Sequence, residues 1–100
     1  MAGDPMSTRA LDVHIVTPSQ EVWAGEAKFV VARSVAGELG VLPGHEPVLA
    51  VLGDGPLKVE TPDGTVVAEV DGGFLSVGPP IESVTRVDIL AEHVREVSGV

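Results

Sequence analysis

Histidine, serine and carboxylate side chains are the groups in this sequence that could do chemistry, and their spacing decides which chemistry is open. The histidines are His14, His45 and His93, and none forms the H-x-H or H-x-x-x-H pair that is typical of metal sites. No serine lies in a G-x-S-x-G turn, the local signature of an exposed nucleophile. The carboxylates are many but scattered. The residues therefore favour a binding or structural module over an enzyme.

Two short patterns match part of a known metal-binding or phosphate-binding motif but lack residues that the full motif needs. His45 and Glu46 follow Pro43 and Gly44, which is similar to one half of a cupin metal motif, but no second histidine stands two residues later. The glycines at 37, 40, 72 and 73 have no lysine and no strand–loop–helix setting, so they do not form a phosphate-binding loop. A cupin-like metal-dependent enzyme stays open as an alternative reading.

The densest set of backbone constraints lies between residues 37 and 52. Its glycines can adopt conformations closed to other residues, and its prolines fix their own backbone and remove N–H donors. These breakers are Gly37, Gly40, Pro43, Gly44 and Pro47. The apolar residues between them are Leu39, Val41 and Leu42. The pattern predicts a bent, partly exposed loop over residues 37–47, leading into a buried strand over residues 48–52.

Composition and charge set outer bounds on the fold and its partners. A chain of 100 residues predicts one domain. A net charge of −9 argues against nucleic acid as a partner, because nucleic-acid binding needs a basic face. There is no cysteine, so disulfides and thiolate metal sites are excluded. No apolar run approaches the about 20 residues that cross a bilayer, which predicts a soluble protein of the cytoplasmic side.

The elements that must position these residues are predicted to be strands. Apolar and polar residues alternate with period two in several short stretches, and β-branched valine is the main apolar residue. Turn signals separate the stretches at residues 53–56, 62–64 and 78–80. The predicted strands cover residues 11–17, 21–24, 27–33, 48–52, 57–61, 66–70, 74–77 and 84–90. This spacing predicts an all-β fold, a β-sandwich or flattened barrel.

The two ends of the chain are predicted to differ from the middle. Residues 1–8 are expected to be a disordered leader or a cloning remnant. If Met6 is the true start, the remnant is residues 1–5. Beyond residue 90, apolar residues recur three apart at Ala91, Val94 and Val97, which predicts a short helical stub. Residues 92–100 would then be the start of a truncated or absent helical domain, and residues 9–91 the sandwich domain.

Several motifs together resemble the ε subunit of bacterial F-type ATP synthases, which is equivalent to the mitochondrial δ subunit. The loop at residues 37–47, Gly-Glu-Leu-Gly-Val-Leu-Pro-Gly-His-Glu-Pro, is similar to the signature loop of that family. Residues 11–18 and 22–25 resemble its first two strands. Residues 71–77, with their glycine pair, and residues 87–92 resemble its last strands. The resemblance covers nearly everything after the leader.

The resemblance implies a ten-stranded β-sandwich and a non-catalytic role in the central rotor stalk. It implies that the chain links the γ subunit to the c-ring and helps to couple proton translocation to ATP synthesis, at the cytoplasmic face of the cell membrane and without direct insertion into it. No cofactor is implied. A free-standing β-sandwich adaptor, unrelated to the synthase, is the further alternative.

The resemblance also implies which residues face the c-ring. The matched loop would present Glu38, Val41, Leu42 and His45 to the polar loops of the ring, with Glu38 meeting a basic residue there. A stiff loop can present side chains at little ordering cost. The alternative for Leu42 is that it caps the core.

The chain also departs from the family pattern. The family usually carries a C-terminal helical hairpin that can inhibit ATP hydrolysis and in some members binds ATP, and this chain ends at Val100. We therefore expect the chain as written to lack both the inhibitory latch and ATP binding.

Overall fold

The computed structural model describes residues 10–99, and these residues form eight β-strands and no helix. None of the described elements is a helix long and apolar enough to cross a membrane. The strands are β1 (Ala10–Val16), β2 (Glu21–Ala27), β3 (Phe29–Ser34), β4 (Gly37–Val41), β5 (Val48–Leu52), β6 (Gly55–Thr61), β7 (Gly64–Val77) and β8 (Val84–Ser98).

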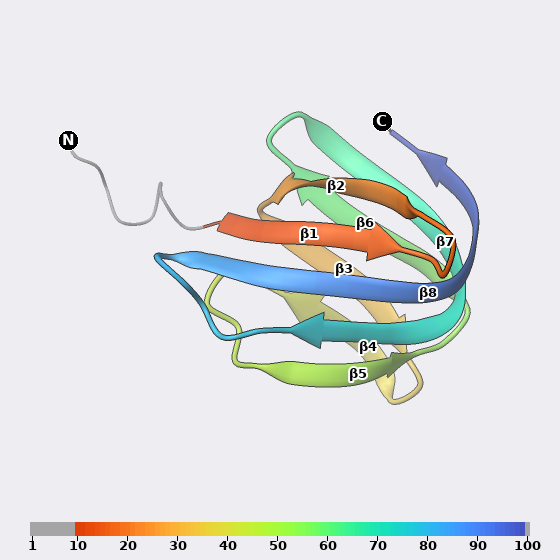
Figure 1. Ribbon diagram of the computed structural model, residues 1–100, viewed down its shortest axis with the longest axis horizontal. Coiled ribbons are helices and arrows are strands. Elements are labelled where there is room, and N and C mark those ends of the chain that lie inside the picture. The colour runs from red at the N-terminus through yellow and green to blue at the C-terminus, as the bar shows by residue number, and fades with distance from the viewer. Residues whose placement is uncertain (1–9, 100) are drawn as a thin grey trace.

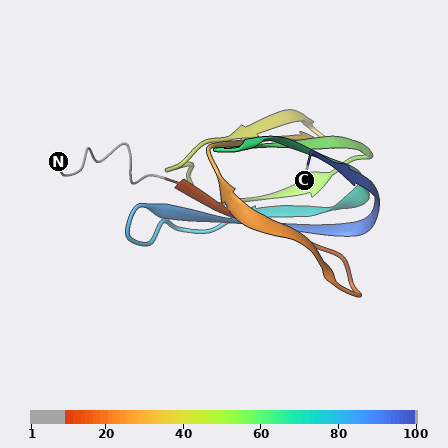
Figure 2. The same cartoon turned by 90° about the horizontal axis from the view of Figure 1, so that it is seen from above.

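The strands form one continuous sheet that folds over into two layers (Figures 1 and 2). The order is β2-β1-β8-β7-β5-β3-β4, and β6 pairs with both β3 and β7. All pairs are antiparallel except β1 with β8. One layer holds β2, β1, the first half of β8, the second half of β7, and β5. The other holds β4, β3, β6, the first half of β7 and the end of β8.

The long strand β7 belongs to both layers because it bends at a glycine pair. Gly72 and Gly73 have φ of 67° and 119°, which are left-handed values that favour glycine. Before the pair, the buried residues are the even-numbered ones from Val66 to Val70, and after it they are Leu75 and Val77. The bend therefore shifts the alternation by one residue, so that both halves turn an apolar face inward.

The core lies between the layers and is made of alternating strand residues. In β1, Leu11, Val13 and Ile15 are fully buried while the residues between them are half-buried. Fully burying a side chain of this size contributes about 1.5–3 kcal/mol, so the inward residues stabilise the sandwich. Thr85 is the one buried polar residue in residues 10–99. The all-β sandwich prediction is confirmed.

The predicted count of ten strands needs one correction. The structure has eight continuous strands, and β7 and β8 each bend and contribute a segment to both layers. Counted as segments, these eight strands supply ten. The predicted strands at residues 66–70 and 74–77 are the two halves of β7.

The predicted helical stub is wrong, because β8 continues as a strand to Ser98 and pairs with the first half of β7. The misleading three-residue spacing comes from irregular strand geometry. Val94 and Val97 oppose the inward residues Val70 and Ala68, and the register shifts between them by one extra residue, Arg95. The extra residue of this β-bulge separates two inward-facing valines by three positions, and that spacing is also typical of a helix. The sandwich extends through Ser98, while the predicted leader at residues 1–8 lies outside the described residues.

The predicted loop at residues 37–47 is shorter than expected. Its first part is strand β4, which pairs with β3 from Val30↔Val41 to Ser34↔Gly37. The following strand β5 is also less buried than predicted, since only Leu52 is buried. The predicted hairpin around Pro62 and Asp63 is confirmed, as Thr61 pairs with Gly64.

Candidate functional site

Strand β4 presents the first of the predicted contact residues. It stands last in the strand order, so it is an edge strand of the described sheet. Glu38 and Gly40 are exposed, while Val41 is fully buried. Glu38 lies opposite Arg33 of β3 in the strand register. Side chains alternate between the two faces of a strand. Since Val41 faces the core, Glu38 faces solvent.

A tight turn follows β4 and holds the next two predicted residues. The N–H of His45 donates to the carbonyl oxygen of Leu42 at 3.0 Å, and Gly44 has φ of 88°. Pro43 at the second position and a left-handed glycine at the third are the features of a type II β-turn. His45 Nδ1 donates to the carbonyl oxygen of Glu46 at 2.7 Å, which orients the imidazole ring.

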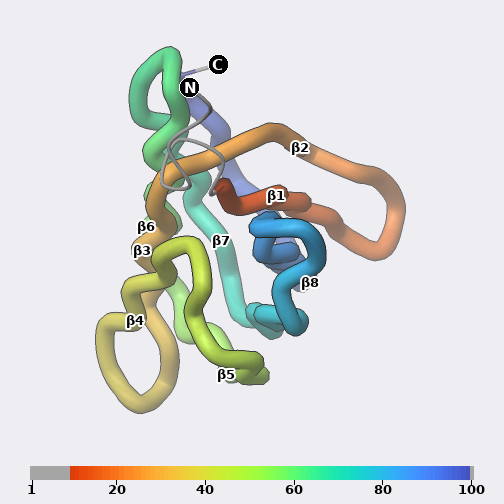
Figure 3. Tube along the Cα trace, turned by 90° about the vertical axis from the view of Figure 1, so that its left-hand side faces the viewer, coloured from red at the N-terminus to blue at the C-terminus, as the bar shows by residue number. Residues whose placement is uncertain are grey.

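The turn is tied to the sandwich by a residue that is far away in the sequence. The N–H of Gly44 donates to the Thr85 hydroxyl oxygen at 2.9 Å. Because Thr85 is buried in β8, this bond connects the exposed turn to the core. Figure 3 looks at this end of the molecule, where the segment between β4 and β5 lies beside the start of β8. These bonds therefore hold the turn rigidly at the surface of the sandwich.

The four predicted residues do not form one compact loop. Leu42 is 58% exposed, so the alternative that it caps the core is wrong. His45 is half-buried beside it in the turn. Val41 is buried at 0% exposure, so its side chain is not available to a partner and the prediction is corrected at this residue. Glu38 lies four strand residues before Leu42, a distance of about 13 Å along the strand.

Sequence reasoning missed the loop that neighbours this turn. Between β7 and β8, Ile81 and Val84 exchange backbone N–H and carbonyl bonds of 2.8 and 3.0 Å. Glu82 and Ser83 between them have positive φ, of 51° and 68°. Ile81 is 72% exposed at the edge of this turn. The two prolines before Ile81 signalled a turn, but nothing in the sequence showed that it lies near Gly44 and Thr85.

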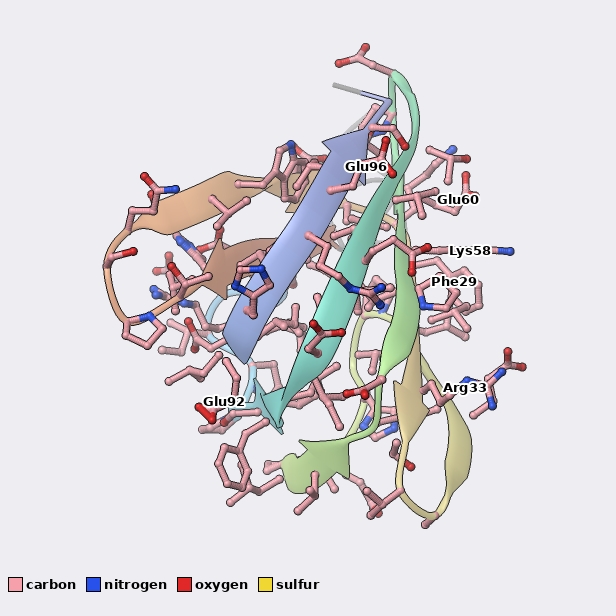
Figure 4. All side chains as sticks on the ribbon, turned by 90° about the vertical axis from the view of Figure 1, so that its right-hand side faces the viewer. Phe29, Arg33, Lys58, Glu60, Glu92 and Glu96 are labelled. Carbon is pink, nitrogen blue, oxygen red and sulfur yellow. The ribbon has the colours of Figure 1, made fainter. Side chains whose placement is uncertain are left out.

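The outer face of the layer formed by β4, β3, β6, the first half of β7 and the end of β8 carries several charged side chains. Figure 4 shows Phe29, Arg33, Lys58 and Glu60 pointing away from the opposite layer. On the same layer, Arg95 of β8 pairs with Asp71 of β7 at 3.0 Å. Exposed pairs of this kind contribute little to stability, so this face is best described as a solvated surface.

The histidines lie in three separate environments. His14 of β1 has its ring nitrogens 3.0 Å from Asp12 Oδ1 and 2.9 Å from Glu21 Oε1. The second of these contacts joins β1 to β2 across the hairpin. His93 is exposed on β8. Within residues 10–99, no three histidine, aspartate or glutamate side chains are grouped so that they could hold a metal ion.

Comparison with known proteins relates this fold to one family. Residues 10–97 match the family described as the ATP synthase delta/epsilon chain, beta-sandwich domain. The ATP synthase epsilon chain of Streptomyces coelicolor is 48% identical over 83 residues, which cover 82% of this chain and 63% of that one. The epsilon chain of Frankia casuarinae is 54% identical over 84 residues, covering 83% of this chain and 93% of that one.

Solved structures show the same fold at lower identity. A chain in the Euglena gracilis mitochondrial ATP synthase structure that contains OSCP, F1 and the c-ring aligns with a TM-score of 0.76 at 24% identity. That alignment covers 94% of this chain and 56% of the Euglena chain. The chain spans less than two thirds of the length of its Streptomyces coelicolor relative. The match over residues 10–97 nevertheless includes all eight strands almost completely, and the chain belongs to the family of ATP synthase delta/epsilon chains, of which it forms the β-sandwich domain.

Proposed function

We propose that this chain is a non-catalytic subunit of the rotor stalk of an F-type ATP synthase. The observation that carries the proposal is the family match over residues 10–97, which is supported by relatives named ATP synthase epsilon chain. In this role the chain links the γ subunit to the c-ring and helps to couple proton translocation to ATP synthesis. It lies at the cytoplasmic face of the cell membrane as a peripheral part of the complex, and it needs no cofactor of its own.

The proposed c-ring surface runs along the edge strand β4 and into the turn that follows it. Glu38 of β4 and Leu42 of the turn are both exposed, and His45 lies in the same turn as Leu42. Val41 supports this surface from the core. Because β4 is paired and the turn is bonded to Thr85, little conformational freedom remains to be lost on docking.

Glu38 is the residue through which we test the c-ring surface. A carboxylate at an exposed edge favours a basic partner, so Glu38→Lys turns an attraction into a repulsion. In membranes that contain the synthase with this chain as its ε subunit, we expect ATP-driven proton pumping to fall several-fold relative to ATP hydrolysis. The urea unfolding midpoint of the isolated variant should stay unchanged, since Glu38 is exposed.

Asp63→Lys is the matched control, because Asp63 is exposed in the hairpin turn between β6 and β7 and the charge change is the same. It should pump protons as the parent protein does. Wild-type coupling in Glu38→Lys would remove Glu38 from the proposed surface.

A further inference from the structure

Thr85 occupies a core position of the kind that apolar residues fill elsewhere in β8. It is the first inward-facing residue of this strand and is followed by Val87 and Ile89, and all three side chains are at most 1% exposed. A hydroxyl group that is buried without a partner costs free energy, so a polar side chain at such a position needs a specific bond. The Thr85 hydroxyl oxygen accepts the N–H of Gly44 at 2.9 Å.

The position of this hydroxyl group is fixed by the core around it. Thr85 lies opposite Leu11 of β1 in the strand register, and Leu11 is fully buried. A β-branched side chain also has restricted rotation about χ1. The hydroxyl oxygen is therefore a fixed acceptor at the end of the sandwich, and the exposed turn bonds to it.

The bond from Gly44 acts on the central peptide of the turn that runs from Leu42 to His45. This peptide joins Pro43 to Gly44. Type I and type II turns differ mainly in the rotation of their central peptide, and type II needs positive φ at the third residue. Gly44 has φ of 88°, so the turn is type II. Proline followed by glycine is compatible with both types, but rotation to type I would turn the Gly44 N–H away from Thr85.

The same rotation decides where the Pro43 carbonyl group points. The described residues contain no cis peptide bond. In a planar trans peptide the C=O and N–H groups point in opposite directions. Since the Gly44 N–H points toward the buried Thr85, the Pro43 carbonyl oxygen points out of the sandwich. A backbone carbonyl is a strong acceptor, and this one lies between Leu42 and His45 of the proposed c-ring surface.

We propose that Thr85 is a positioning residue of the c-ring surface. Its hydroxyl group holds the turn in the type II form, and the Pro43 carbonyl oxygen then faces the c-ring as the acceptor for a hydrogen-bond donor. This inference rests on the proposed function, because that function places the c-ring beside the turn. One hydrogen bond of this kind changes the ratio of the two turn types by about two- to tenfold.

The test replaces the two residues that select the turn type. Thr85→Val keeps the branched shape of the side chain but removes the hydroxyl group, whereas Thr85→Ser keeps it. Gly44→Ala opposes positive φ directly, and a Cβ at Gly44 meets only open space, so its effect is not due to a clash. Each variant is added to membranes that contain the same synthase depleted of its ε subunit, and ATP-driven proton pumping is measured relative to ATP hydrolysis.

The variants should differ in a fixed order. Pumping relative to hydrolysis should fall several-fold in Gly44→Ala and by about twofold or more in Thr85→Val, while Thr85→Ser should behave as the parent chain does. The double variant of Gly44→Ala and Thr85→Val should be no worse than Gly44→Ala alone, because both changes act on the same peptide.

The hairpin turn between β6 and β7 provides matched controls, since it holds none of the proposed c-ring residues. Thr61 also holds its turn with a hydroxyl group, which donates to the carbonyl oxygen of Gly64 at 2.8 Å. Gly64 has φ of 136°, and a Cβ there also meets only open space. Thr61→Val and Gly64→Ala should therefore pump protons as the parent chain does.

Nuclear magnetic resonance measures the turn type directly. In a type II turn the backbone of the second residue is extended, which brings the Pro43 Hα close to the Gly44 amide hydrogen. This proximity should persist in Thr85→Ser and weaken in Thr85→Val and Gly44→Ala. Urea unfolding midpoints of the Thr85 variants should stay close to that of the parent chain, because Gly44 and Thr85 line a shallow surface hollow where water can bond to the freed N–H.

The outcomes separate this inference from the proposed function. If the parent chain does not restore pumping to the depleted membranes, the proposed function fails and the positioning role fails with it. If the parent chain restores pumping and Thr85→Val pumps equally well, only the positioning role of Thr85 is overturned. The same conclusion follows if Thr85→Ser is as impaired as Thr85→Val, or if Thr85→Val keeps the type II turn unchanged.

Discussion

Gly73 has the strongest steric constraint of the glycines in the strands. A Cβ at this position would collide with the carbonyl oxygen of Leu90 and would lie 2.9 Å from the Cα of Ala91. Its φ of 119° is also one that side chains rarely allow. Both constraints arise because β7 and β8 bend together at this point, with Gly73 opposite Ala91.

Replacing Gly73 by alanine should therefore destabilise the protein by about 3 kcal/mol or more, through backbone strain and the clash with β8. Urea unfolding followed by circular dichroism measures the loss. Gly78→Ala is the control, because a Cβ at Gly78 meets only open space, and it should change stability by no more than about 0.5 kcal/mol. Equal stability of the two variants would show that the bend does not need glycine.

At the scale of elements, the end of β8 completes one layer of the sandwich. Val94 and Val97 pack against the core from a segment whose hydrophobic spacing predicted a helix. A helix there would have had no partner, whereas the strand gains the backbone hydrogen bonds that the first half of β7 offers. The availability of a partner strand therefore outweighed the local pattern.

Val94→Ser and Val97→Ser should each cost about 1–2 kcal/mol, because each removes part-buried apolar surface from the core. Glu96→Gln, an exposed neighbour on the same strand, should have almost no effect. Chemical shifts of the Cα and Cβ atoms over residues 92–98 provide a direct check. Helical shifts, together with no loss of stability in the valine variants, would contradict the strand.

At the scale of the whole molecule, the two layers are covalently continuous through β7 and β8. The described chain has a radius of gyration of 13.0 Å, which is the value of about 13 Å expected for a compact domain of 100 residues. Since each bent strand contributes to both layers, neither layer is complete without the other. The sandwich should thus behave as one cooperative unit.

Unfolding should accordingly follow a single transition in both layers. The amide signal of Val13 on β1 reports on one layer. The amide signal of Val59 on β6 reports on the other. In a urea titration the two midpoints should coincide, as expected of a two-state domain. Two separate midpoints would show that the layers unfold independently.

The sequence by itself determined the all-β class, the hairpin around Pro62, the position of most strands and the family. These features are local, because side chains alternate with period two along any strand with one buried face, and turns need particular residues. The signature segment at residues 37–47 also predicted an exposed, stiffened structure, and Leu42 and the bonded turn around Gly44 agree with that prediction.

The tertiary structure alone decided which residues share a surface. Residues 37–41 became a strand because β3 supplies their hydrogen bonds, and Val41 was thereby drawn into the core. Thr85 supports a turn 41 residues away. Val51, Phe74, Leu90 and Val16 lie side by side because of the register of four strands, and a shift of one residue would turn each side chain to the opposite face. Register arises from pairing between distant segments, so no local pattern could specify it.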